Sequence, residues 1–406
     1  MAEPGIPTGP KLTTKPMRVL VNDHSGHAFP YELSGELASR GHDVHHVYCS
    51  NVVTPKTNFS NGQVTTHAID ADRPFAKYDL RRRALDELRY GWRSVKIARQ
   101  VRPERLIVSN MPLLAVGVQW LWALNTRTKW VLWLQDLQAG LAEMVIGKRN
   151  AVTRTLSLVE GWLIRRAWRV VAISAEFRSE VLKVGAKPER VLVIENWAPL
   201  DDLPLRPRRN PWSDRHGLSD QFVFLYSGTL AMKHDPRLLL ALADEFRNEA
   251  EVRIVVVSEG VGADWLSEAN GVRTRSNLVL LPFQPFEELA DVLGSADVLV
   301  AVLERAAGMF SVPSKTLSYL CAGRAILGSI PEQNAAASLI AERAPAGICV
   351  PPGDDAGELL AAARKLFENS ALRQSFGTSA RAYAETTFDR RAIGDRFEHL
   401  LTRGST

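Results

Sequence analysis

The chain has 406 residues, of which 46% are hydrophobic and 23% charged. This composition predicts a globular protein with two or three domains and excludes a largely disordered or fibrous chain. Its three cysteines (Cys49, Cys321 and Cys349) lack metal-binding spacing, which favours reduced thiols in a cytoplasmic protein. The longest apolar run, Met111–Leu124, is too short to span a bilayer.

Positive charge is concentrated in the first half of the chain. Residues 81–105 carry a net charge of +6 and residues 148–169 a net charge of +5, whereas the whole chain carries +5. This local excess predicts a basic surface for an acidic partner such as phosphate or an anionic membrane. Nucleic acid is not expected as a partner, because no recognised nucleic-acid module accompanies the charge.

Residues 17–195 read as alternating strands and helices, starting with a strand at 17–22, a helix at 31–40 and a strand at 44–49. This rhythm predicts a parallel sheet covered by helices, and the missing G-x-G-x-x-G pattern argues against a dehydrogenase. Gly26 in the first loop would let a ligand approach the backbone closely. His24 and His27 beside it could contact a substrate or be ordinary loop histidines.

Two acidic loops follow strands in this half. Asp70 and Asp72 have the spacing of a metal-binding pair, but Arg73-Pro74 follows, and we interpret the segment as a turn. Asp136 follows the apolar strand 130–134, and ligands collect at carboxyl ends of strands in open α/β sheets. Asp136 is therefore a candidate to bind an acceptor hydroxyl, and its alternative role is to cap the next element.

Two predicted helices, 78–100 and 151–168, combine the basic residues with aromatic ones. The aromatic residues are Tyr90, Trp92, Trp162 and Trp168. Tryptophan and tyrosine beside arginine are typical of a face that lies on anionic lipid headgroups. The alternative is a solvated basic face whose aromatic side chains point into the core.

Composition divides the chain into further parts. Residues 1–16 are predicted to be a disordered extension, and the Pro-rich stretch 196–216 an interdomain linker. Residues 217–385 read as a second Rossmann-like α/β domain, and residues 386–406 as a C-terminal helix that could pack back on the N-terminal domain. The predicted fold class is thus α/β, with two Rossmann-like domains facing across a cleft.

The second domain carries an anion site in its sequence. Residues 308–328 read as a loop, a helix that starts near Pro313 and stops at Gly323, and a buried strand. Ser314 and Lys315 fall in the first helical turn, where unpaired N–H groups and the helix dipole favour a diphosphate. Lys233 is a second cation that can reach the same site. Glu259 could accept hydrogen bonds from ribose or sugar hydroxyls, or be a solvated loop residue.

On these motifs the chain resembles GT-B glycosyltransferases, in particular glycosyltransferase family 4 and its bacterial surface-polysaccharide members. The resemblance is carried by five segments in order: Tyr226-Ser-Gly-Thr-Leu-Ala-Met-Lys233-His, Val257-Ser-Glu-Gly260, Ala296-Asp297-Val298, Ser311-Val-Pro-Ser-Lys-Thr-Leu-Ser-Tyr-Leu-Cys-Ala-Gly323-Arg and Val350-Pro-Pro-Gly-Asp354. Two positions depart from the common pattern: Thr229 replaces an arginine, and Ser318 replaces a glutamate that would hold the donor ribose.

The resemblance implies retaining transfer of a sugar from a nucleotide diphosphate sugar, with no cofactor and no bound metal. It implies a C-terminal donor domain and an N-terminal acceptor domain. We expect Asp136, Lys233 and His27 in the catalytic centre. The expected donor-binding residues are Gly26, Gly228, Thr229, Lys233, Glu259, Gly260, Ser314, Lys315 and Ser318.

The sequence therefore predicts a cytoplasmic glycosyltransferase of surface-polysaccharide synthesis, peripheral at the inner face of the membrane, with a glycan or lipid-linked acceptor. Two alternatives remain open. One is a nucleotide-sugar epimerase of similar architecture, and the other is a non-catalytic subunit that binds sugar or nucleotide.

Overall fold

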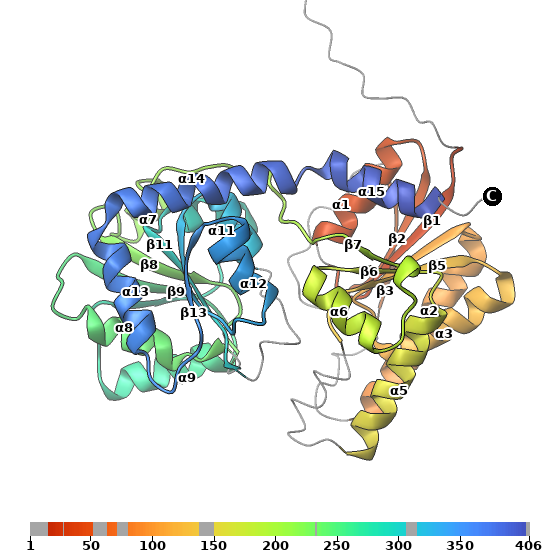
Figure 1. The fold of residues 1–406 in the computed structure, drawn as a ribbon, viewed down its shortest axis with the longest axis horizontal. Helices are drawn as coiled ribbons and strands as arrows, with labels where there is room; N and C mark the ends of the chain where they lie inside the picture. The colour runs from red at the N-terminus through yellow and green to blue at the C-terminus, as the bar shows by residue number, and fades with distance from the viewer. Residues whose placement is uncertain are drawn as a thin grey trace, which may run out of the picture. The chain divides into compact units, whose positions relative to one another are not determined.

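A computed structural model describes residues 15–26, 28–51, 63–70, 80–137, 150–231, 234–305 and 315–402. The chain divides into two compact units (Figure 1). The first unit combines Met1–Asn196 with Asp389–Thr406, and the second is Trp197–Phe388.

Within its described residues, the first unit holds a seven-stranded parallel sheet of order β3-β2-β1-β4-β5-β6-β7. Its strands are β1 (Arg18–Asp23), β2 (Asp43–Cys49), β3 (Thr65–Ile69), β4 (Arg105–Ser109), β5 (Lys129–Leu134), β6 (Arg169–Ala172) and β7 (Val191–Val193). The chain moves outward from β1 in one direction and then returns to add β4 on the other side. The strand order thus reverses between β1 and β4, which is where open α/β sheets bind ligands.

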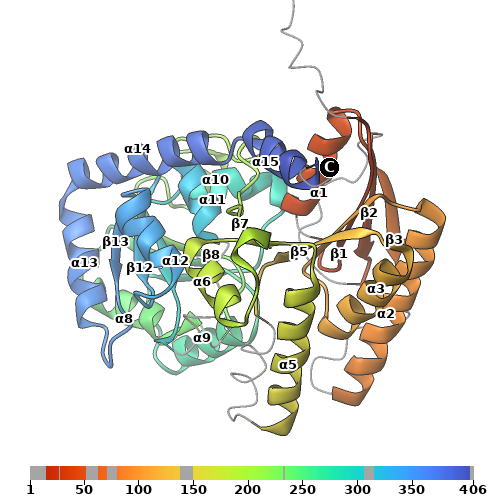
Figure 2. The same cartoon turned by 45° about the vertical axis from the view of Figure 1, so that its right-hand side comes forward.

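Helices cover both faces of this sheet, since parallel strands are buried on both sides. The helices are α1 (Ala28–Ser39), α2 (Leu80–Val101), α3 (Leu113–Thr126), α5 (Ala151–Arg166), α6 (Ala175–Lys183) and α15 (Arg390–Thr402). Figures 1 and 2 show α1 beside α15 on one face and α2, α3 and α5 side by side on the other.

The last helix is bound firmly to the first unit. Arg40, directly after α1, forms ion pairs with Asp395 and Glu398 of α15. Phe397 is fully buried, and its ring centroid lies 4.8 Å from that of Trp133 in β5. Side chains of α15 therefore complete the core of the first unit, although Arg40 and Asp395 are 355 residues apart in the sequence.

The second unit repeats the plan with a six-stranded parallel sheet of order β10-β9-β8-β11-β12-β13 in the part that the structure describes. Its strands are β8 (Phe222–Ser227), β9 (Val252–Val257), β10 (Leu278–Leu281), β11 (Val298–Val302), β12 (Ala325–Ser329) and β13 (Gly347–Val350). Here the order reverses between β8 and β11, so this unit has its own switch point.

The helices of the second unit are α7 (Pro211–Arg215), α8 (Arg237–Glu245), α9 (Val261–Val272), α10 (Leu289–Gly294), α11 (Lys315–Ala322), α12 (Ala335–Ser338), α13 (Gly357–Glu368) and α14 (Ser370–Thr387). Leu242 and Phe246 at the end of α8 meet Leu359 and Leu366 of α13 in one buried cluster over the sheet. On the other side, α11 packs against α14 and against β11.

All but the first residue of the Pro-rich stretch predicted as a linker, 196–216, belongs to the second unit, which starts at Trp197. Asn210 caps α7 by accepting from the backbone N–H groups of Trp212 and Ser213, and Trp212 is fully buried. Arg208 forms an ion pair with Asp297 over 2.9 Å. The abundance of proline here reflects turns packed on a domain, because composition alone does not separate these from a free linker.

Most predicted strands and helices agree with the structure to within a few residues, and Gly323 has the predicted left-handed conformation (φ +62°). The helix α9 was missed, since Gly260, Gly262 and Gly271 made residues 258–272 resemble a loop. Of the predicted disordered extension, residues 1–14 lie outside the described residues.

Candidate functional site

Glycine-bearing loops follow β8 and β9 at the carboxyl edge of the second sheet. Gly228 has φ +128° and Gly260 has φ +113°, conformations that side chains rarely adopt. A Cβ at Gly260 would lie 3.1 Å from the carbonyl oxygen of Leu230. The loops are also joined, since Leu230 donates its N–H to Glu259 O over 3.0 Å. Backbone can therefore approach a ligand closely along this edge.

Tyr319 of α11 holds the point where β8 and β11 part. These two strands pair only through Phe224 and Leu225 of β8, so Ser227 has no backbone partner on β11. The Tyr319 hydroxyl accepts from Ser227 N–H at 2.9 Å and lies 3.1 Å from Ser227 O and 3.2 Å from Val300 O, either of which can accept its proton. A fully buried side chain from α11 thus takes over the missing ladder contacts at the switch point.

Lys315, the first residue of α11, lies against the end of β8. Its ammonium bonds to the Tyr226 hydroxyl and lies 3.7 Å from the centroid of that ring. A Cβ at Gly228 would be 3.3 Å from Lys315 Cε, so only glycine leaves ordinary room for the lysine stem. Burial raises the pKa of Tyr226 well above its ordinary value, so the phenol stays neutral and leaves the lysine charge uncompensated by it.

The structure brings together several of the predicted donor-binding residues. Gly228, Thr229, Glu259 and Gly260 lie in the two joined loops, with Thr229 and Glu259 exposed. Ser318 is half-buried in α11, three residues after Lys315, so both side chains share one side of the helix. The predicted residues Ser314, Lys233 and His27 lie outside the described residues.

The carboxyl edge of the first sheet carries a second polar cluster. Asp23 at the end of β1 is buried and accepts from Asn110 Nδ2 over 3.1 Å, which joins the loops after β1 and β4 at that switch point. His24 packs edge to face on Tyr90, with ring centroids 4.6 Å apart. Burial lowers the pKa of His24 to about 4, so the ring is neutral at pH 7.

Two predicted residues lie near this edge. Gly26 follows the β1 loop with φ +67°, and its N–H donates to Asp23 O. Asp136 is half-buried two residues after the end of β5. The sequence prediction did not include Asp23 and Asn110 in this cluster. Asp23 ends the buried strand β1 and Asn110 directly follows the buried strand β4, and this position at the strand ends was the available signal.

The aromatic residues of the basic helices divide between the two alternatives left open by the sequence. Tyr90 is 4% exposed and donates its hydroxyl to Asn22 over 2.7 Å, so it belongs to the interior. Trp162 packs edge to face on Trp120, and Trp168 is half-buried beneath arginine and lysine side chains. Only Trp92 of the four is largely exposed, at 57%. Helix periodicity had not been used to separate the two faces.

The chain was compared with protein-family models, with curated protein sequences and with solved structures. Residues 27–197 match the family model of the glycosyl transferase 4-like domain. No curated protein sequence matches the chain.

Solved structures of similar fold cover the whole two-domain chain. The HepE protein of Anabaena, solved in complex with UDP, has 16% identity and a TM-score of 0.71 over 95% of this chain and 100% of its own. Sucrose-phosphate synthase from Thermosynechococcus elongatus has 14% identity and a TM-score of 0.76 over 95% and 98%. WaaG, a glycosyltransferase involved in lipopolysaccharide biosynthesis, has 17% and 0.68 over 96% and 100%.

The fold is therefore that of the GT-B glycosyltransferases. Residues 27–197 match the glycosyl transferase 4-like domain, and the two-domain fold is shared with glycosyltransferases of known structure.

We predict that Tyr319→Phe destabilises the second unit by about 1–3 kcal/mol, because Ser227 N–H would be buried without an acceptor. Chemical denaturation measures this loss. Val272→Ala, at a position 90% exposed on α9 of the same unit, is the control and should stay within about 0.5 kcal/mol. Equal stability of Tyr319→Phe and wild type would contradict this role of the hydroxyl.

We predict that Lys315→Ala weakens nucleoside diphosphate binding at least tenfold, about 1.4 kcal/mol, because the helix start loses its cation. Isothermal titration with UDP measures the change. Lys365→Ala, an exposed lysine of α13, removes the same charge elsewhere on the unit and should bind as wild type does. Unchanged affinity of Lys315→Ala would exclude the diphosphate from this end of α11.

Proposed function

We propose that the protein transfers a sugar, with retention of anomeric configuration, from a UDP-sugar to a glycan or lipid-linked acceptor in surface-polysaccharide synthesis. The observation that carries the proposal is the carboxyl edge of the second sheet, where Lys315 lies beside the glycine-bearing loops at the switch point. Support for UDP comes from HepE, which was solved with UDP and with UDP-glucose. Support for the pathway comes from the similarity to WaaG.

The donor would lie with its diphosphate over Gly228 and the start of α11. In the transition state negative charge grows on the departing diphosphate, and the Lys315 ammonium with the N–H groups of the helix start stabilises it most at that stage. Ser318 and Glu259 offer a hydroxyl and a carboxylate for the ribose or sugar hydroxyls. No metal or cofactor enters this scheme, because the cation supplies the charge.

The acceptor would bind to the first unit, at the carboxyl edge that carries Asp23, His24 and Asn110. Asp136 remains our candidate for contact with the acceptor hydroxyl. The ring of His24 is neutral, so it can donate one hydrogen bond to a sugar hydroxyl or accept one from it. In front-face retention a donor phosphate oxygen takes the acceptor proton, so the protein need not supply a nucleophile.

Donor turnover measured with and without an acceptor tests the proposal. The enzyme is incubated with UDP-glucose and with other UDP-sugars, alone or with membrane lipid extract. We expect UDP release only when acceptor is present, and an axial or equatorial product bond that matches the donor. Isomerised UDP-sugar without acceptor would instead indicate an epimerase, and binding without any turnover would indicate a non-catalytic subunit.

Membrane contact is part of the proposal, and three helices of the first unit support it. They hold six of the ten large hydrophobic side chains that are exposed among the described residues: Leu85, Leu88, Trp92, Leu121, Leu124 and Leu158. Exposed Arg89, Lys96 and Arg154 lie among them. Apolar side chains beside cations suit an anionic lipid surface, where each basic group contributes about 1 kcal/mol. No helix among the described residues is long and apolar enough to cross the bilayer.

We predict that Trp92→Glu combined with Leu158→Glu lowers binding to vesicles containing anionic lipid at least fivefold, because two apolar anchors are lost and negative charge is added. Vesicle co-sedimentation measures this at physiological salt. Val272→Glu, at a position 90% exposed in the second unit, is the control and should bind as wild type does. If the double variant and the control partition equally, α2 and α5 do not form the docking face.

A further inference from the structure

A cavity of about 520 Å³ lies on the second unit, beside α14. It is lined by α14 and by residues at the amino ends of β11 and β12, including Asp297, Arg324 and Ala325. The donor site proposed above lies at the opposite, carboxyl edge of the same sheet, beside β8 and β9. The cavity is therefore a separate feature, and its volume falls in the range of small-molecule sites.

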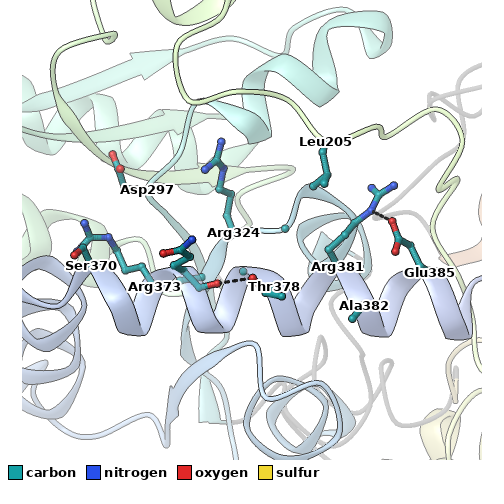
Figure 3. A pocket seen from close by; sticks show the side chains of 13 residues that line it. Leu205, Asp297, Arg324, Ser370, Arg373, Thr378, Arg381, Ala382 and Glu385 are labelled. Carbon is teal, nitrogen blue, oxygen red and sulfur yellow. Dashed lines mark hydrogen bonds and ion pairs between the residues drawn. The ribbon is translucent and has the colours of Figure 1, made fainter.

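One wall depends on a close approach of backbone to backbone. A Cβ at Gly377 of α14 would lie 2.4 Å from the carbonyl oxygen of Gly323, and Gly323 itself has φ +62°. Two glycines thus set the distance between α14 and the turn that ends α11. Figure 3 shows Arg373, Thr378 and Arg381 on α14, with Asp297 and Arg324 on the opposite wall of the cavity.

The charges around the cavity do not balance. Arg381 is paired with Glu385 over 2.7 Å. Asp297 already accepts from Arg208 and from the backbone N–H of Val223, both at 2.9 Å. Arg324 and Arg373, whose pKa values are influenced by the same Asp297, complete a group of three guanidiniums around one carboxylate. This leaves an excess of about two positive charges.

The two guanidiniums keep donors available for a ligand. Arg324 donates through Nη2 to the carbonyl oxygens of Arg206 and Gly294, and among the described residues its Nη1 group has no protein acceptor, whereas its Nε is buried. Arg373 donates to two carbonyls at the end of α13 and stacks over Phe222. Burial lowers the pKa of both arginines because it disfavours the charged guanidinium. A dianion bound between them would stabilise the charged form through charge-assisted hydrogen bonds.

We propose that this cavity binds a small phosphate monoester, such as a sugar phosphate, at a site distinct from the donor site. The phosphate group lies between Arg324 and Arg373, which match its oxygens with paired N–H donors. Gln374 and Thr378, exposed on the α14 wall, take the hydroxyl groups of the organic part. Because α11 runs from Lys315 to Ala322 and ends at this cavity, an occupant contacts the far end of the helix that carries Lys315.

Ribose 5-phosphate serves as the probe in an isothermal titration of the full chain, with saturating UDP present to occupy the donor site. We expect binding of ribose 5-phosphate, weaker binding of inorganic phosphate and no binding of ribose. Arg324→Gln should weaken binding at least tenfold. Arg253→Gln is the matched control, because that guanidinium also donates only to carbonyls but lies outside the cavity, and it should change affinity less than twofold.

Gln374→Trp provides a second variant that keeps every guanidinium and occupies the cavity with an indole. It should also abolish binding of ribose 5-phosphate, even if Arg324→Gln folds poorly. Binding that is absent in wild type, equal for ribose, or undiminished in Gln374→Trp would overturn the proposal. If UDP itself does not bind to the protein, the proposed donor site is wrong. The titration with ribose 5-phosphate can then be repeated without UDP and still tests the cavity.

Discussion

The hydroxyl of Tyr319 is the contact on which the second unit's site depends. In a continuous sheet Ser227 would bond to the neighbouring strand, but β8 and β11 separate after Leu225. The Tyr319 hydroxyl meets both polar groups of Ser227 and reaches Val300, so α11 is fixed to both strands at the point of separation. Since Lys315 lies four residues earlier, about one turn, the same contact sets where the cation at the helix start lies.

Each unit uses the same constraint in its own way. A parallel sheet whose strand order reverses leaves a gap between neighbouring carboxyl ends, and polar groups there must find other partners. In the first unit β1 and β4 stay paired as far as Asp23 and Ser109, and Asn110 donates to the Asp23 carboxylate just beyond the last pair. In the second, Tyr319 bridges the gap between β8 and β11, and the glycine loops leave room for a ligand beside it. The first unit thus has a buried carboxylate beside a neutral histidine at its switch point, and the second has a cation.

Much of this architecture could be predicted from the sequence, because the apolar strands of a parallel sheet and the glycines that stop helices are local signals. Gly228, Gly260 and Lys315 were found from their neighbours along the chain. The role of the Tyr319 hydroxyl could not be predicted in this way, since its partners lie 19 and 92 residues away. For the same reason the sequence left open whether Tyr90 faces the core or the surface. The guanidinium cluster around Asp297 is assembled from four separate segments.

The central claim is that the carboxyl edge of the second sheet binds the nucleoside diphosphate of the donor. Amide hydrogen exchange of the full chain with and without UDP tests it most directly. The account predicts slower exchange in residues 227–230, 258–262 and 315–318 on addition of UDP, with little change at the amino edge around residues 297 and 324. Protection confined to other parts of the chain, or unchanged exchange in all three segments at saturating UDP, would contradict it.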